Sequence, residues 1–501
     1  MLLPLLAGAA GVLGFAPFYI WPAPILAMAV LLGTWQASGS PLQAALSGFA
    51  FGLGLFLAGV SWVFVSLHFF GGMPLLLAAL ATFLFCAYLA LFPALAGWAT
   101  LRFAGGSPGA RLALGAAAFV ACEWLRGTLF TGFPWLTFGT SQVPSSPLAG
   151  FAPVLGGYGV SLAMAIAAAL MATWGGRAAT RRSRLVPIAA LALLFALGGA
   201  LRFVSWTTPA APAISVALLQ GNVPQQIKWQ EEVRTATLLA YRDMIFRASA
   251  QVVVLPETAL PAFLDQLPED YLRGIREHAR REGKEVLLGI VERDERAAGQ
   301  TYYNSLVRLT GAGGAYRKRH LVPFGEFIPP GFRFVLAVLH IPMSDFNRGG
   351  ARQAALEAAG TRFGVAICYE DIFGEEVIDA LPAAQVLLNV SNDAWFGESW
   401  AAEQHLQASQ MRALETGRWM LRATNTGVTA AIDERGHVVS RLAPFITGTL
   451  VAQPVPRAGS TPYALAGNVP VIVLLVVVAL AASGRVRWRG SATGTGPAQL
   501  P

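Results

Sequence analysis

The sequence predicts a polytopic α-helical membrane domain followed by an α/β domain, and three observations support this prediction. Only 13% of the 501 residues are charged and 55% are hydrophobic, whereas an average soluble domain has about 25% charged residues. Residues 1–101 contain no Lys, Arg, Asp or Glu. After residue 213, short apolar runs are separated by helical stretches, which is typical of a buried sheet covered by helices.

Apolar segments long enough to be membrane spans occur at both ends of the chain, since a span needs ~20 mostly apolar helical residues. About eight are expected: Leu3–Phe15, Ile20–Trp35, Leu42–Val65, Pro74–Trp98, Leu112–Phe130, Val160–Trp174, Leu185–Phe203 and Val469–Ala482. The first contains Pro4 and the last is marginal in length. Met1-Leu2-Leu3 lacks the basic start of a cleaved signal peptide, so the first segment is expected to be retained.

The arginines predict both the domain order and the orientation. They cluster at 102–111, 177–184 and 485–489, and Lys/Arg-rich short loops stay in the cytoplasm. We therefore expect a transmembrane domain of about seven spans over 1–206, a linker over 207–213, an exported α/β domain over 214–465, a C-terminal span over 466–484 and a cytoplasmic tail over 485–501. The net charge of +8 belongs to the membrane-flanking segments, so a nucleic-acid partner is excluded.

Strands and helices of the α/β domain follow from its apolar runs. Strands are expected at Ile214–Leu219, Val252–Leu255, Val286–Val291, Ser305–Leu309, Phe363–Ile367, Val386–Val390 and Thr424–Ile432. Helices are expected at Glu231–Ala248, Asp270–Glu282 and Ala402–Thr416. Phe327–Leu339 is apolar but too short to span a membrane; it is either an arm lying in the membrane surface or an ordinary core helix.

Three chemically capable residues follow or lie near predicted strands. Glu257 comes directly after Val252–Leu255, Lys318 lies in a basic run that leads to Glu326, and Cys368 directly follows Phe363–Ile367. Taken singly, each has an ordinary structural interpretation: a strand-end acceptor, a solvated surface charge and an inert thiol. Taken together, they supply a nucleophile, a base that ionises it and a positive donor for a developing oxyanion.

Histidine offers an alternative base for the thiol. His320 and His405 are the candidates, but neither has an obvious partner pattern in the sequence.

Cys86 and Cys122 lie within predicted spans, where a small buried apolar role is favoured. Near the outer end of the fifth span, Glu123 and Arg126 are expected to form a local ion pair that clamps the membrane surface, with a ligand role as the alternative. Phe133-Pro134-Trp135 and Tyr158 are expected to lie on the same outer face as an aromatic belt, with a binding site as the alternative.

The sequences around these residues resemble a known family. Leu-Pro-Glu-Thr at 255–258, Tyr-Arg-Lys-Arg-His-Leu-Val-Pro-Phe-Gly-Glu at 316–326 and Ile-Cys-Tyr-Glu at 367–370 are similar to the three catalytic motifs of the nitrilase (carbon–nitrogen hydrolase) superfamily. With the polytopic first half, Gln220-Gly221-Asn222 and the stretch 391–397, the chain resembles the membrane-bound branch of that superfamily, the apolipoprotein N-acyltransferases.

The resemblance implies an αββα sandwich and a role for each matching residue. Glu257 would be the general base, Lys318 the oxyanion stabiliser, Cys368 the nucleophile and Glu326 a supporting acid. The substrate-binding positions implied are Trp229, Tyr369 and Glu370.

The resemblance also implies a reaction, its partners and a location. An acyl chain would pass from a membrane phospholipid to a thioester on Cys368, and then to the N-terminal amine of the diacylglyceryl-cysteine of an apolipoprotein. No metal and no cofactor are implied, and a monomer is expected. The place would be the bacterial inner membrane, with the catalytic domain on the periplasmic side. The alternatives are a membrane-tethered amidase that hydrolyses small amides, and a transporter, which the scarcity of charge within the spans disfavours.

Overall fold

The computed structural model describes residues 1–175, 181–293, 301–311, 313–329, 331 and 345–483. The predicted cytoplasmic tail, its arginine cluster and most of the predicted arm at 327–339 lie outside these residues.

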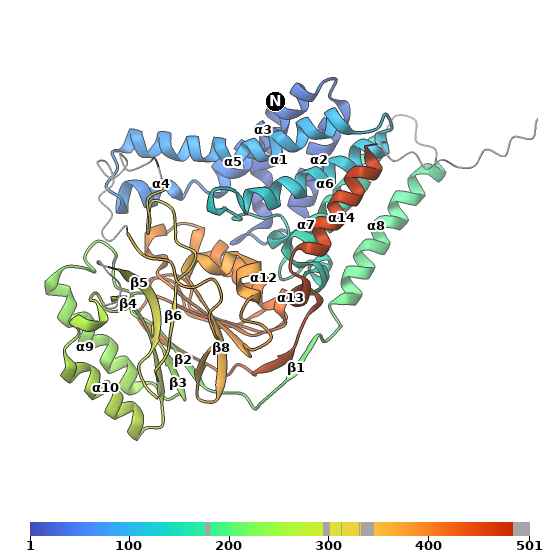
Figure 1. The fold of residues 1–501 in the computed structure, drawn as a ribbon. Helices are drawn as coiled ribbons and strands as arrows, with labels where there is room; N and C mark the ends of the chain where they lie inside the picture. The colour runs from blue at the N-terminus through green and yellow to red at the C-terminus, as the bar shows by residue number, and fades with distance from the viewer. Residues whose placement is uncertain (176–180, 294–300, 312, 330, 332–344, 484–501) are drawn as a thin grey trace, which may run out of the picture.

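Helices cover most of each predicted membrane span, and they form one layer of the molecule (Figure 1). They are α1 (Leu2–Gly11), α2 (Pro22–Ala37), α3 (Pro41–Gly59), α5 (Leu75–Phe103), α6 (Pro108–Arg126), α7 (Ala152–Ala172), α8 (Arg181–Leu201) and α14 (Val469–Ala482). Within the described residues, the helices long and apolar enough to cross a membrane are Pro41–Gly59, Leu75–Phe103 and the continuous helical stretch Pro147–Ala172. The others are shorter or carry more charge.

Two predicted spans end earlier than expected. The third stops at Gly59, and the chain continues through a short helix, α4 (Val63–Val65), and a π-helical turn (Ser66–Phe70). The fifth stops at Arg126, and no α-helix could extend to the predicted end at Phe130 because Phe130 and Thr131 adopt left-handed φ angles of 53° and 78°.

The α/β region contains two six-stranded sheets. The order of the first is β13 (Gly448–Ala452), β2 (Val216–Gln220), β3 (Val252–Val254), β4 (Glu285–Arg293), β5 (Tyr302–Arg308) and β6 (Ala315–Arg317). The order of the second is β12 (Val438–Arg441), β11 (Ala430–Ile432), β10 (Met420–Thr424), β9 (Val386–Ser391), β8 (Thr361–Ile367) and β7 (Leu356–Ala358). The central pairs β2–β3–β4 and β8–β9–β10 are parallel.

The sheets pack face to face and helices cover their outer faces, so the predicted αββα sandwich is observed. Side chains from both sheets share one core, for example Val254, Leu306, Ile367 and Leu388. Helices α9 (Glu231–Arg247) and α10 (Glu269–Arg281) pack on the first sheet. On the second sheet lie α11 (Gly374–Ile378) and α12 (Ala401–Thr416).

One predicted strand is wrong, and the predicted linker contains a strand. Thr424–Ile432 is not a single strand; it contains the end of β10, a turn and β11, which pair antiparallel. The chain reverses at 425–427, where the sequence Asn-Thr-Gly is typical of a turn, and Asn425 and Thr426 are buried there. Within the linker, β1 (Thr207–Pro209) pairs with β14 (Arg457–Gly459), which precedes α13 (Pro462–Ala466).

Helix α12 lies between the sheets and the helical layer (Figure 1) and joins them through buried glutamines. Gln404 binds the Gly59 carbonyl at 3.0 Å and the Trp135 indole at 2.7 Å. Gln407 accepts from the amide of Ala16 at 2.8 Å. Because buried polar groups are costly to leave unpaired, these bonds hold the two parts in one register.

The segment after α6 also contacts α12, which changes the expectation for its aromatic residues. Glu123 and Arg126 form the predicted ion pair at 4.0 Å, and both are buried. The Arg126 guanidinium donates to the carbonyls of Phe133 and Trp135. Trp135 is only 4% exposed and packs against His405 with ring centroids 5.7 Å apart. It therefore belongs to the junction between the two parts and not to a surface belt.

Candidate active site

Cys368 lies at a sharp turn immediately after β8, as predicted. Its φ is +55°, a left-handed value that is strained for a residue with a Cβ. The turn is held by its carbonyl, which accepts from Asn389 at 3.0 Å and lies 3.2 Å from His405 Nε2. A strained turn at a strand end presents a nucleophile toward an open site. Cys368 packs against a core that combines side chains of the helical layer and of the α/β domain, so the residue is located where the two parts of the molecule meet.

Glu257, Lys318 and Glu326 are brought together around one amide side chain. Lys318 Nζ donates to Glu257 Oε1 at 3.2 Å and to Glu326 Oε1 at 2.9 Å. Asn304 Nδ2 bonds the same two carboxylate oxygens at 2.7 and 3.1 Å. The other Glu257 oxygen accepts from the Asn392 amide at 2.7 Å. Two of the three N–H bonds of Lys318 thus go to the acids, and the third bonds neither of them.

The charges of Glu257 and Lys318 both act on Cys368, in opposite directions. Burial and the Glu257 carboxylate raise the pKa of the Cys368 thiol well above its usual value, and Lys318 lowers it by less. Burial alone would lower the pKa of Lys318, but Glu257 and Glu326 outweigh it and hold that pKa well above normal. The resting site therefore contains a protonated thiol and an ammonium held by two carboxylates.

The three predicted substrate-binding residues occupy different environments. Glu370 is 1% exposed, and its oxygens accept from the amides of Ile367, Arg319 and His320 and from the Tyr316 hydroxyl. It ties the Lys318 loop to the Cys368 turn, which is a positioning role. Tyr369 is buried, and its hydroxyl donates to the Gly132 carbonyl in the helical layer at 3.1 Å. Trp229 is partly exposed on the loop that precedes α9.

His405 has partners that the sequence did not reveal, but none of them is the sulfur. It bonds Asp371 at 2.6 Å and Asp393 at 3.1 Å, and Arg422 completes the group by pairing with both aspartates at 2.9 and 3.3 Å. All four side chains are at most 1% exposed. Burial lowers the pKa of His405, yet Asp371 and Asp393 outweigh burial and raise it to about 9. The network therefore pairs two cations, His405 and Arg422, with two anions, Asp371 and Asp393, and His405 lies next to the carbonyl of Cys368.

This network predicts a loss of stability in alkali. His405 titrates at about 9 in the folded protein against 6.5 when unperturbed. The contribution of His405 to the free energy of unfolding is therefore complete below about pH 6.5 and is lost as the pH rises through about 9. We expect the melting temperature in detergent to fall over this range, and the fall to be smaller in His405→Gln. His437→Gln, at a partly exposed histidine beside Asp433, is the control. If the melting temperature fell equally with pH in the unaltered protein, His405→Gln and His437→Gln, His405 would not be the group responsible.

Sequence reasoning missed several residues of the site, for different reasons. Asn392 and Asp393 directly follow β9, the same strand-end signal that identified Glu257 and Cys368. Asn304 lies inside β5, where a polar residue gives no such signal. Lys228 was also missed: it is buried on the loop before α9, and its Nζ donates to Thr258 Oγ1 at 3.1 Å.

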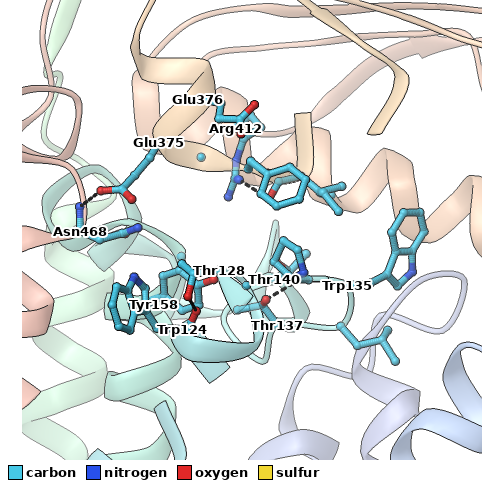
Figure 2. A pocket seen from close by; sticks show the side chains of 18 of the residues that line it. Trp124, Thr128, Trp135, Thr137, Thr140, Tyr158, Glu375, Glu376, Arg412 and Asn468 are labelled. Atoms are coloured by element: carbon cyan, nitrogen blue, oxygen red, sulfur yellow. Dashed lines mark hydrogen bonds between the residues drawn. The ribbon is translucent and has the colours of Figure 1, made fainter. Parts of the chain in front are cut away.

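A cavity of about 270 Å³ lies beside the site, between the helical layer and the Cys368 turn. Figure 2 shows that Trp124 and Tyr158 face it from the helices and Arg412 from α12. Glu375 accepts from the Asn468 amide at 3.0 Å across one end of it. Cys368 is not among its lining residues, so this cavity is separate from the reacting sulfur.

A thiol, a carboxylate and a lysine on an αββα sandwich are the features of the carbon–nitrogen hydrolase class of enzymes. Residues 215–463 match the family model described as "Carbon-nitrogen hydrolase", and residues 7–170 match "Apolipoprotein N-acyltransferase N-terminal domain".

Curated relatives cover nearly the whole chain. Proteins named apolipoprotein N-acyltransferase from Nitrosomonas europaea, Methylococcus capsulatus and Ralstonia nicotianae are 51%, 48% and 44% identical to it. The matches span 95%, 95% and 97% of this chain and 95%, 94% and 94% of those proteins. The chain belongs to the apolipoprotein N-acyltransferase family.

Proposed function

We propose that this protein transfers an acyl chain from a membrane phospholipid to the N-terminal amine of a diacylglyceryl-cysteine lipoprotein, through a thioester on Cys368. The observation that carries the proposal is the placement of Cys368. The charges of Glu257 and Lys318 both act on the thiol, and Cys368 packs against a core that the helical layer shares with the α/β domain.

In the first half-reaction, the sulfur attacks the ester carbonyl of the phospholipid while Glu257 accepts the thiol proton. Lys318 stabilises the oxyanion with its remaining N–H. Glu257 then returns the proton to the departing alkoxide, so that a lysophospholipid leaves and a thioester remains. In the second half-reaction, the acceptor nitrogen attacks the thioester, the C–S bond breaks and an amide forms.

The helical layer has a physical purpose in this reaction, because both substrates are lipids. Burial of an acyl chain is worth about 0.8 kcal/mol per CH₂, so a soluble enzyme would have to overcome a large cost to extract two or three chains. A thiol at the boundary of an apolar helical layer meets the chain without extraction. We propose about eight spans, the domain boundaries given above, and residence in the bacterial inner membrane with the catalytic domain on the periplasmic side.

Intact-mass measurement tests the proposal directly. Incubation with phospholipid should add one acyl group, mapped to the Cys368 peptide, and a diacylated lipopeptide should remove that group and appear as a triacylated product. The first competing function, a tethered amidase, predicts instead that small amides release ammonia and that no triacylated product forms. A thiol that stays unmodified in the presence of phospholipid would contradict the proposal.

A further inference from the structure

The proposed transfer leaves one proton without an acceptor. At neutral pH the acceptor amine is largely an ammonium, since α-amino groups have a pKa of about 7.7–8.0. Amide formation removes two protons from that nitrogen. One passes through Glu257 to the departing sulfur of Cys368. Glu257 holds only one proton at a time, so the second proton needs a different base.

Thr258 carries a hydroxyl, directly follows Glu257 in the chain and adopts a left-handed φ of +43°. It is partly exposed, whereas Glu257 is 6% exposed. Thr258 is therefore the more accessible of these two neighbours to an acceptor nitrogen that approaches Glu257.

Behind the hydroxyl lies a buried amine. Lys228 is 1% exposed, and its Nζ is 3.1 Å from Thr258 Oγ1. Its loop is fixed to the same site, because Gln225 accepts from the Asn392 side chain at 2.8 Å and the Asn392 amide donates to Glu257.

The two lysines of the site differ in their readiness to release a proton. Burial lowers the pKa of Lys228 to about 8. The negative charge of Glu257 favours the ammonium form of Lys228, but it offsets the effect of burial only in part. The pKa of Lys318 is held well above normal by its two carboxylates. Near neutral pH, Lys228 is therefore neutral in a fraction of the molecules and can accept a proton, whereas Lys318 cannot.

We propose that Thr258 and Lys228 form a second proton acceptor, separate from Glu257, that removes the extra proton of the ammonium acceptor. The ammonium donates to Thr258 Oγ, the Thr258 hydroxyl proton moves to neutral Lys228, and the amine is left free to attack. Lys228 then returns the proton to solvent. This inference rests on the proposed function and concerns only its second half-reaction.

The test measures the two half-reactions separately in Lys228→Met and Thr258→Val. Formation of the Cys368 thioester from phospholipid is followed by mass, and its transfer to a diacylated lipopeptide in a single turnover. We expect both variants to form the thioester at rates near those of the unaltered protein and to slow transfer about 100-fold, the contribution of a positioned base. Thr258→Ser should restore transfer. The sequence has three lysines, and Lys284→Met, at the one that lies outside the site, is the control.

A second acceptor separates proton removal from a structural effect. In an aminooxy analogue of the lipopeptide the nitrogen is unprotonated at pH 7, so no extra proton has to leave. The defect of Lys228→Met should then shrink to about threefold or less, because a base that is not needed contributes nothing. An equal defect with both acceptors, or an equal loss in thioester formation, would overturn the inference. If the unaltered protein forms no thioester at all, the proposed function itself is wrong. That outcome differs from an equal defect with both acceptors, which would overturn only the role of Thr258 and Lys228.

Discussion

Cys368→Ala is expected to abolish acyl transfer, with a loss of about 10⁵–10⁶-fold in turnover. The reason is that the residues around the sulfur act on it and cannot replace it. Glu257 is placed to accept its proton, and Lys318 is placed to stabilise the adduct that it forms. Without the sulfur no thioester forms, and the acceptor amine has no activated acyl group to attack.

The other two cysteines provide matched controls for this variant. Cys86 and Cys122 are buried within helices, and we expect Cys86→Ala and Cys122→Ala to keep turnover within a few-fold of normal. The measurement is the yield of triacylated lipopeptide, with the melting temperature of each variant recorded in detergent. Substantial triacylation by Cys368→Ala would show that the acyl chain reaches the amine without a covalent step at this residue.

Arg422→Met is expected to produce the largest loss of stability, about 3–5 kcal/mol, because it leaves buried carboxylates uncompensated. Arg422 and its partners Asp371 and Asp393 have fully buried side chains. Removing its charge leaves two anions with His405 as the single cation. Since His405 and Asp371 hold the Cys368 turn from below, we also expect turnover to fall.

Two comparisons test whether the loss in Arg422→Met comes from an uncompensated buried charge: a double variant that restores charge balance, and a variant at an ion pair on the surface. Arg422→Met combined with Asp393→Asn leaves one aspartate with one protonated histidine, and it should recover part of the loss. Arg441 pairs with Glu403 at the surface, with side chains 39% and 23% exposed, so Arg441→Met should cost no more than about 1 kcal/mol. Melting temperatures in detergent compare the variants. Equal shifts for Arg422→Met and Arg441→Met would contradict a buried network.

Much of the candidate site could be predicted because its signals are local in the chain. Glu257 and Cys368 follow predicted strands, whereas Lys318 was marked by its basic run, since no strand was predicted over β6. The buried strands of the α/β domain also followed from short apolar runs, whereas the two-sheet αββα arrangement was implied by the family resemblance. The prediction at Thr424–Ile432 was wrong for a different reason: residues 425–427 are Asn-Thr-Gly, which are typical of a turn, and a single strand over this segment ignores that signal.

Residues that act by contact across long separations could not be predicted. His405 lies 37 residues from Cys368, Lys228 lies 30 residues from Thr258, and Gln407 binds a backbone group 391 residues away. Neither composition nor periodicity contains these pairings, because each depends on how the sheets and α12 pack.

The sequence by itself determined which groups this protein has for acyl transfer and that apolar helices accompany them, since hydropathy and strand-end motifs are properties of neighbouring residues. Only the tertiary structure decided where those groups lie. It set the buried ion network beneath the Cys368 turn, the position of Lys228 near Glu257 and the packing of Cys368 against a core that the helical layer shares with the α/β domain. The physical reason is that burial and charge pairing depend on through-space neighbours, which exist only once the chain has folded.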